Sequence, residues 1–286
     1  MKKHLNTVRR DIRNRSIVSY LVLGLFLVVT LFPVLSVTSF AFLPQDAIKK
    51  FPPQLIPNSL YLDNFTYVLQ NTTIALSMLN SLIVVLGAVV CVVVIGSIGG
   101  YGAAKSSPRH RAFMYGVLLV TQMVPAMANM IPIYSMMAKA NLLNTRAGLI
   151  LIYTVNTLPL SMLILIGFFK SSIDEIEEAA MIDGCNWWQA FTRISLPIAR
   201  PGLVSAVIFT FALSWNEFMM SKLIITKPAM VTFQVGLYNM MATYVEKRSR
   251  YDLLSAAALM GLVPVLIIYA TFQKGFTEGI TAGSIK

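Results

Sequence analysis

"EEAAMIDGCNWWQAFTRISLPIARP", residues Glu177 to Pro201, places acids, a glycine and two tryptophans between two long apolar stretches. The whole chain of 286 residues is 56% hydrophobic and 12% charged, with a mean hydropathy of +0.70. An ordinary soluble domain has about 25% charged residues. The composition therefore predicts a membrane protein, in which so polar and so patterned a segment needs a specific reason.

Six apolar runs reach the roughly 20 residues that a membrane-crossing helix requires. They lie at residues 17–40, 78–104, 112–137, 148–169, 202–225 and 253–272. We therefore expect an all-α membrane protein with six transmembrane helices. The third run contains Pro125 and Pro132, and proline removes an intrahelical donor, so this helix is expected to kink or to end early.

The basic residues indicate how the chain is oriented. Residues 1–16 are rich in Lys and Arg, and the apolar run that follows is too long for a secretory signal, so it is expected to be a retained anchor. If successive spans cross the membrane in opposite directions, 14 of the 23 Lys and Arg residues lie on the same side as the N-terminus. The positive-inside bias then predicts that both termini are cytoplasmic. The net charge of +11 lies mostly beside spans, so no nucleic-acid partner is expected.

The remaining segments follow from this topology. Residues 41–74 form an extracytoplasmic loop rich in proline, expected to act as a lid or contact surface without a core of its own. Residues 75–274 are the predicted transmembrane domain, with five helices and a cytoplasmic loop at 171–200. Residues 275–286 are a cytoplasmic tail. The sequence "YVEKRSRYD", Tyr244 to Asp252, is basic on the outer side, against the bias.

Within the cytoplasmic loop the sequence predicts two short helices joined by a glycine turn. Ser172, followed three residues later by Glu175, is a capping-box pattern. Gly184 is the residue type that best ends a helix in the left-handed conformation. Asn186 is expected to cap the second helix, and Pro197 to end it. An apolar stripe runs along that second helix: Trp187, Ala190, Phe191 and Ile194.

Five of the twelve acids of the chain lie within ten residues of this loop, without a basic residue among them. They are Asp174, Glu175, Glu177, Glu178 and Asp183. A solvated acidic loop is the simplest interpretation, because charge runs usually are solvated. The caps, the glycine turn and the apolar stripe instead favour a rigid, protruding pair of helices. The acids in this segment repel one another, so we expect them to face a basic cleft on a soluble partner.

This loop resembles the EAA loop of permease subunits in binding-protein-dependent ABC importers. The matching positions are Glu178, Ala179, Ala180, Gly184, Ile194, Leu196 and Pro197. The resemblance implies that the first short helix is a coupling helix, which sits in a cleft of the ATPase subunit and transmits its closure to the membrane helices. Together with Asp183, these residues are the predicted contacts with the ATPase. Glu178 would offer a charge to a basic residue, and Gly184 would set the angle between the helices.

Four further stretches resemble the maltose-type carbohydrate permeases, in particular the six-helix member of the permease pair. They are "NSLIVVLGAVV" (Asn80 to Val90), "PLSMLILIGFF" (Pro159 to Phe169), "SWNEF" (Ser214 to Phe218) and "GFTEGITAGSIK" (Gly275 to Lys286). The resemblance implies the type I ABC importer permease fold. It also implies that the C-terminal tail reaches into the ATPase dimer through Gly279, Thr281, Ala282 and Gly283.

The same resemblance implies the partners and the substrate class. The chain would work in the bacterial cytoplasmic membrane, surrounded by lipid, with a second homologous permease, two ATPase subunits and an extracytoplasmic solute-binding protein. The transported solute would be a sugar or oligosaccharide. ATP and Mg would bind to the ATPase, so no cofactor, metal ligand or catalytic residue is expected in this chain.

Residues 99–106 nearly match the P-loop pattern of nucleotide-binding proteins. However, Ala104 replaces the last glycine of the pattern, and a membrane span precedes it where a P-loop needs a strand, so no nucleotide site is expected here.

Glu217 is the one acid that falls inside a predicted span, and ionisable groups in the membrane are functional candidates. With Trp215 and Asn216 it would line a sugar pathway, because aromatic faces stack on sugar rings and polar groups bind hydroxyls. Packing at the membrane interface explains these three residues equally well. Three other polar residues in the spans are weaker pathway candidates, better explained by interhelical hydrogen bonds: Asn80, Gln122 and Asn156.

An ion-coupled secondary transporter is the alternative function. Such a protein uses intramembrane acids as proton or cation sites, and only Glu217 is available for that role. The sequence also lacks the internal repeats common in secondary transporters. Co-purification of an ATPase with the chain would distinguish the two functions.

Overall fold

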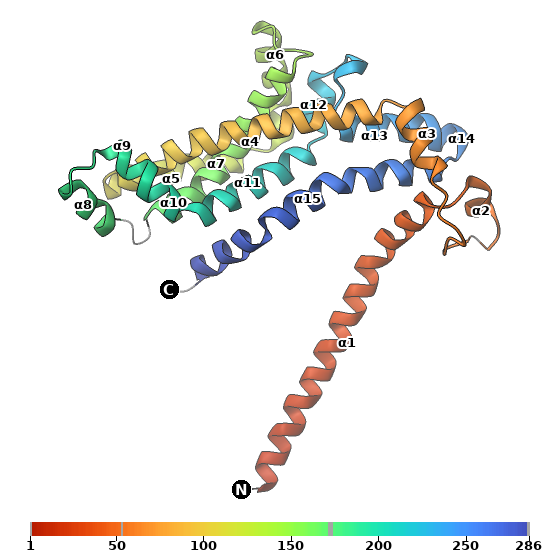
Figure 1. The fold of residues 1–286 in the computed structure, drawn as a ribbon, viewed down its shortest axis with the longest axis horizontal. Helices are drawn as coiled ribbons and strands as arrows, with labels where there is room; N and C mark the ends of the chain where they lie inside the picture. Colours follow the sequence, from red (N-terminus) through yellow and green to blue (C-terminus); the bar gives the residue numbers. More distant parts are fainter. Residues whose placement is uncertain (1, 53, 171–173, 285–286) are drawn as a thin grey trace. The chain divides into compact units, whose positions relative to one another are not determined.

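The computed structural model describes residues 2–52, 54–170 and 174–284, and these residues form helices, turns and loops (Figure 1). The chain divides into two compact units. The first consists of Met1–Asn71 and Met240–Met260, and the second of Thr72–Asn239 and Gly261–Lys286. Residues 240–260 thus fold with the N-terminal part of the chain.

Four helices among the described residues are long and apolar enough to cross a membrane. They are the apolar part of α1, Ser19–Ala41, then α4 (Ile74–Lys105), α7 (Arg146–Lys170) and the first part of α15, Tyr251–Gln273. Two bent helix pairs bring the number of spans to as many as six. One pair joins Pro108–Met123 to Met127–Lys139 at 84°, and the other joins Trp187–Ile198 to Arg200–Trp215 at 72°.

The other elements are short. In the first unit they are α2 (Gln45–Lys49), α3 (Asp63–Asn71), the π-helical η4 (Met241–Val245) and α14 (Glu246–Arg248), besides α1 (Lys2–Ala41). The second unit adds α5 (Pro108–Met123), the 3₁₀-helical η1 (Ala126–Asn129) and η3 (Pro228–Met230), α6 (Met130–Lys139), α8 (Asp174–Ile182), α9 (Trp187–Ala190), the π-helical η2 (Phe191–Ser195), α10 (Leu196–Ile198), α11 (Arg200–Trp215), α12 (Met219–Ile224) and α13 (Phe233–Met240). Helix α15 (Tyr251–Ser284) runs from the first unit into the second.

Two of the predicted spans are broken. The third ends at Met123, and Pro125 directly precedes the 3₁₀ turn η1, so the chain breaks at the first of the two prolines. Pro132 lies in the first turn of α6, where its missing amide hydrogen has no intrahelical partner to lose. The fifth was expected to reach residue 225, but α11 ends at Trp215. Glu217 therefore lies in the break between α11 and α12 and not inside a span. Its carboxylate caps α12, the helix that follows.

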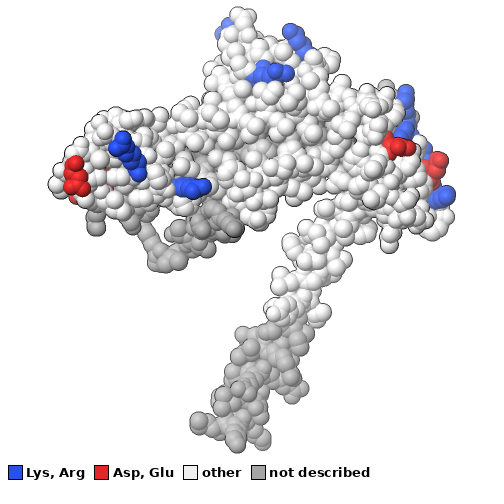
Figure 2. Space-filling model, viewed as in Figure 1, with Lys and Arg blue, Asp and Glu red and all other residues white. Residues whose placement is uncertain are grey.

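Helices α4, α7 and α11 pack together as the core of the second unit, and glycines on α4 allow the close approach. A methyl group at Gly100 would lie 3.1 Å from the Leu165 side chain on α7. At Gly87 it would lie 2.8 Å from Ile150 of the same helix. On the face shown in Figure 2, charged side chains gather over the end that carries α8 and over the end that carries α6 and α12. The surface of α4 between them is uncharged, as expected of a membrane span.

Side chains from α4 hold the irregular backbone that follows α12. Asn80, which is 0% exposed, donates through Nδ2 to the carbonyls of Ala229 (2.9 Å) and Val231 (3.2 Å). Its Oδ1 accepts from the Arg146 guanidinium at 2.8 Å. Asn80 therefore makes the interhelical bonds that the sequence favoured over a role in the pathway, and it satisfies backbone groups that a membrane would leave unpaired.

The loop before α7 supplies a second anchor for the same backbone. Asn144 has left-handed backbone (φ 56°), and its Oδ1 accepts from the amides of Thr226 (2.7 Å) and Lys227 (2.8 Å). Its own amide donates to the carbonyl of Ile224 at 3.1 Å. The segment between α12 and η3 is therefore fixed to the α6–α7 connection by one residue.

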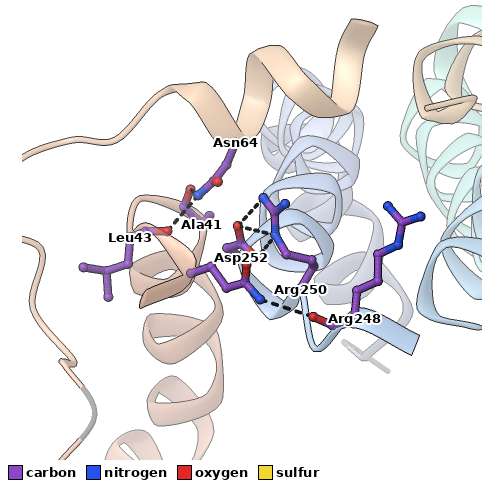
Figure 3. A network of polar contacts seen from close by, with 7 residues as sticks. Ala41, Leu43, Asn64, Arg248, Arg250 and Asp252 are labelled. Carbon is purple, nitrogen blue, oxygen red and sulfur yellow. Dashed lines mark hydrogen bonds and ion pairs between the residues drawn. The ribbon is translucent and has the colours of Figure 1, made fainter. Parts of the chain in front are cut away.

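The first unit ties the predicted extracytoplasmic loop to the basic segment before α15. Asn64 on α3 donates to the carbonyls of Ala41 (3.0 Å) and Leu43 (2.8 Å), which closes the turn after α1 (Figure 3). Arg250 pairs with the buried Asp252 at 2.7 Å, and this hydrogen-bonded contact raises the pKa of the guanidinium above its ordinary value. The Arg250 guanidinium also lies 5.5 Å from the ring centre of Tyr67.

We expect Gly148→Ala to destabilise the chain. A methyl group at Gly148 would lie 2.4 Å from the backbone oxygen of Leu142, which cannot move without breaking the turn before α7. The expected loss of unfolding free energy is roughly 1–3 kcal/mol, measured by thermal unfolding in detergent micelles. Gly102→Ala on α4 is the matched control, because nothing lies within 4 Å of the added methyl. Equal melting temperatures for the two variants would contradict the packing argument.

Candidate coupling site on the α8–α10 loop

Helix α8 ends in a Schellman motif centred on Gly184. The Cys185 amide donates to the carbonyl of Ala180 (3.0 Å), and the Gly184 amide donates to that of Met181 (3.1 Å). Gly184 has φ +94°, a conformation that strains any residue with a Cβ. The predicted glycine turn is therefore present and fixed by its own backbone bonds. The capping residue expected at the other end, Ser172, lies outside the described residues.

A capping box begins the second helix, as the sequence predicted. The Gln189 amide donates to Asn186 Oδ1 at 2.9 Å, and the Asn186 amide donates to Gln189 Oε1 at 2.9 Å. The helix then widens into the π-helical turn η2 and continues through α10. It ends at Ile198, one residue after Pro197, in agreement with the stop predicted at this proline.

Phe191, a residue of the predicted apolar stripe, packs this loop against the membrane helices. The Phe191 ring is 4% exposed, and its centre lies 4.8 Å from that of Tyr101 on α4 and 6.1 Å from that of Phe169 on α7. Ala190 is fully buried beside it. Trp187, which the sequence placed on the same stripe, is the first residue of α9 and is instead 62% exposed.

Two neighbouring acids on α8 have opposite environments. Glu177 is 2% exposed, forms an ion pair with Lys105 at the end of α4, and accepts a hydrogen bond from the Tyr101 hydroxyl at 3.3 Å. Its other oxygen, Oε1, is buried without a hydrogen-bond partner among the described residues. Glu178 is exposed. The sequence assigned a role to Glu178 but missed Glu177, since no local pattern indicates that Lys105 faces it.

The remaining residues of the EAA pattern lie on the outer surface of the loop or at its edge. Ala179, Asp183, Gly184 and Pro197 are exposed, and Ala180, Ile194 and Leu196 are half-buried. Large apolar side chains are exposed around them: Met181, Ile182, Trp187 and Trp188. The loop therefore presents an acidic and apolar surface that the described part of the chain does not cover, suited to docking on another protein.

The predicted contacts of the C-terminal tail belong to the last turns of α15, and their side chains lie outside those described. These residues are Gly279, Thr281, Ala282 and Gly283.

Like Asn80, two more of the six predicted pathway residues are held by contacts within the chain. The Trp215 indole is 3% exposed and stacks between Phe211 (5.6 Å) and Phe233 (5.7 Å). The Glu217 carboxylate accepts from the amides of Met220 (2.7 Å) and Ser221 (3.0 Å), so it caps α12. It also accepts from the Tyr153 hydroxyl on α7 at 3.1 Å.

The other three pathway candidates are exposed. Gln122 lies near the end of α5, Asn156 in the middle of α7, and Asn216 directly after α11. The Asn216 side-chain amide donates to the carbonyl of Ala212 at 2.8 Å. Among the predicted pathway residues, these three are therefore the exposed ones.

Comparison with known proteins gives consistent results. The family described as the binding-protein-dependent transport system inner membrane component matches residues 92–280. A diacetylchitobiose uptake system permease protein of Streptomyces coelicolor is 31% identical over 277 residues, which covers 96% of this chain and 90% of the relative. A sulfoquinovosyl glycerol transport system permease protein of Agrobacterium fabrum is 29% identical over 267 residues, covering 93% of each chain.

The fold also resembles a solved structure. A chain in the crystal structure of a bacterial ABC transporter involved in the import of the polysaccharide alginate superposes with a TM-score of 0.81. The match covers 92% of this chain and 97% of the other, at 23% sequence identity. The helical arrangement predicted from the sequence is thus the one found in an ABC importer.

We expect Lys105→Met to loosen the attachment of α8. The substitution would leave the buried Glu177 carboxylate without its ion-pair partner, at a cost of roughly 1–3 kcal/mol. Hydrogen exchange at the amides of residues 176–190 should become faster, while exchange in α4 and α7 is unchanged. The double variant Lys105→Met/Glu177→Gln should recover part of the protection, because it leaves no unpaired charge. The control Glu178→Gln should not alter exchange; an equal effect of Lys105→Met and Glu178→Gln would contradict the difference between the two acids.

Proposed function

The chain belongs to the family of inner membrane components of binding-protein-dependent transport systems, and we propose that it is a permease subunit of an ABC importer for a carbohydrate. The named solutes of the two relatives, diacetylchitobiose and sulfoquinovosyl glycerol, both contain sugar units. Alginate, imported by the structurally similar transporter, is a polysaccharide. The solute class proposed for this chain is therefore a sugar or oligosaccharide.

The observation that supports this function best is the rigid, uncovered loop from α8 to α10. Its Schellman turn and capping box fix the angle between the two helices, and its outer surface carries Glu178, Ile182 and Trp187. We propose that this surface docks in a cleft of an ATPase subunit, with Glu178 facing a basic residue. ATP and Mg bind to that ATPase, and the permease contributes no catalytic group.

The loop is attached to the membrane helices at two points. Phe191 packs on Tyr101 and Phe169, and Glu177 pairs with Lys105. A displacement of the loop by the closing ATPase therefore moves the ends of α4 and α7 with it. In our proposal this movement shifts the permease between its outward-open and inward-open states, which ATP binding and hydrolysis populate in turn.

Topology and assembly follow the same proposal. Both termini are cytoplasmic, and the C-terminal residues Gly279 to Gly283 extend toward the ATPase dimer. A second homologous permease completes the translocation pathway in the cytoplasmic membrane. The solute-binding protein docks on the opposite side, where Tyr244 to Asp252 provides exposed Arg248 as a cation for an acidic contact.

The solute pathway in this proposal uses the exposed polar residues. Asn156 and Asn216 offer amide groups to sugar hydroxyls, and Gln122 does so from α5. Trp215 and Glu217 position the helices around them, because both are held by contacts within the chain. Asn80 has the same supporting role at the start of α4.

We expect Gly184→Val to uncouple transport from ATP hydrolysis. Nothing lies within 4 Å of an added Cβ, so the substitution acts only through the backbone, where φ +94° costs a β-branched residue at least about 1–2 kcal/mol. The α8–α9 angle should change, while assembly with the ATPase persists. In proteoliposomes, solute uptake should fall strongly relative to ATP hydrolysis. Gly184→Ala is the matched variant and should show a smaller loss; unchanged uptake in both would refute the coupling role of this turn.

Substitutions of the pathway residues should separate binding from stability. Asn156→Ala and Asn216→Ala are expected to raise the apparent KM for uptake of the solute without lowering the melting temperature, because both side chains are exposed. Glu217→Ala should instead lower the unfolding free energy by roughly 1–2 kcal/mol, since it removes the cap of α12. Uptake titrations and thermal unfolding check the two outcomes. If neither asparagine variant changes KM, the pathway lies elsewhere.

A further inference from the structure

The segment that follows α2 carries large apolar side chains that the first unit leaves uncovered. Phe51 is 99% exposed, Ile56 79% and Leu60 71%. Leu55 and Leu62 are more than half exposed as well. Exposed apolar side chains gathered in one short segment of polypeptide indicate a contact surface, because water alone would not favour them.

This segment folds back onto the end of α1 (Figure 1). The Ser39 hydroxyl, in the last turn of α1, donates to the carbonyl of Leu55. The Tyr61 amide donates to the carbonyl of Phe42 at 3.2 Å. Because both bonds lie within the first unit, they fix the depth of the segment relative to the helix.

The depth of Ser39 follows from the length of the apolar helix. The described apolar part of α1, Ser19–Ala41, comprises 23 residues, which at 1.5 Å per residue is about 35 Å, enough to cross the roughly 30 Å of a bilayer core. Ser39 is two residues from the end of this stretch. The Leu55 backbone is therefore held at the boundary between hydrocarbon and headgroups, and not in open water above it.

We propose that residues 51–52 and 54–62 form a membrane-contact loop, which inserts Phe51, Ile56 and Leu60 into the lipid leaflet at the C-terminal end of α1. With the cytoplasmic N-terminus proposed above, this is the outer leaflet. The exposed Lys49 and Lys50 directly precede the loop and meet lipid phosphates. Amphipathic segments of this kind bury apolar side chains roughly 5–10 Å into the interface.

The backbone of the loop suits this environment. Pro52 and Pro57 have no amide hydrogen to satisfy. The Gln54 amide donates to the carbonyl of Ala47 at 3.2 Å, and its side chain donates to that of Ile56 at 2.8 Å. The Gln54 amide and the Ile56 carbonyl of the loop are thus paired, which a poorly hydrated interface favours.

Lipid is favoured over a protein partner because the exposed surface is continuous with the membrane span. The apolar side chains of α1 from Tyr20 to Leu35 are exposed along the helix, and the loop extends this surface beyond Ser39. The two lysines supply charges of the sign that attracts anionic headgroups. Contact with a second subunit would be the competing explanation, and the experiment below distinguishes it.

The test uses a fluorophore placed on the loop. The two free cysteines are replaced as Cys91→Ala and Cys185→Ser, and Ile56→Cys is labelled with bimane in the full chain with its co-purifying subunits. The complex is reconstituted in nanodiscs of phosphatidylcholine and phosphatidylglycerol, with or without lipids brominated near the headgroup. Leu60→Cys is a second probe of the loop, in case one variant folds poorly. Gln70→Cys, exposed on α3, is the matched control.

We expect the bimane at residues 56 and 60 to lose most of its emission to brominated lipid and little to aqueous iodide. The control at residue 70 should show the reverse. Strong quenching by iodide at residue 56, without quenching by lipid, would place the loop in water and overturn the proposal. Protection from both quenchers would show that a protein subunit covers the loop, which overturns it equally.

Discussion

Where a helix is broken within a membrane, the freed backbone groups must find partners in the protein, because a bilayer core offers no water. Around the break between α11 and α12, the second unit supplies three polar side chains: one from α4, one from the loop before α7 and one from the break itself. Glu217 caps α12, Asn144 accepts the amides of the segment after it, and Asn80 donates to the carbonyls beyond η3. These bonds fix the backbone from α12 to η3, and two of the three residues, Glu217 and Asn80, are ones that the sequence offered as pathway candidates.

On the α8 side of the second unit, two adjacent acids differ in burial and therefore in the contacts open to them. Glu177 is desolvated against Lys105 and Tyr101, whereas Glu178 stays exposed one residue later. A buried ion pair adds little net stability, since desolvation offsets much of the attraction, and its better-attested use is to specify one arrangement. Here that arrangement is the docking of α8 on the end of α4, which aims the exposed surface of the loop away from the membrane helices.

Local patterns were sufficient for part of this structure. The apolar runs, the Asn186 cap and the Gly184 turn depend on residues close in sequence, and each was predicted. The break at Glu217 was missed because an apolar run conceals a helix end that is closed by its own side chain. The Glu177 pair was missed because Lys105 is far away in the sequence. The exposure of Trp187 was missed because helical periodicity alone does not show where the packed surface ends, and Trp187 is the first residue of its helix.

Helix α4 connects the two polar sites of the second unit. It runs without interruption from Ile74 to Lys105, with Asn80 holding the irregular backbone near one end and Lys105 holding α8 at the other. The 25 residues between these two side chains span about 38 Å, which exceeds the thickness of the bilayer core. In the function proposed above, a continuous helix bonded at both ends would carry a displacement of the α8–α10 loop toward its opposite end without any change in its own hydrogen bonds. Gly87, Gly96, Gly99 and Gly100 of α4 lie directly against side chains of α7, so the two closely packed helices would move together.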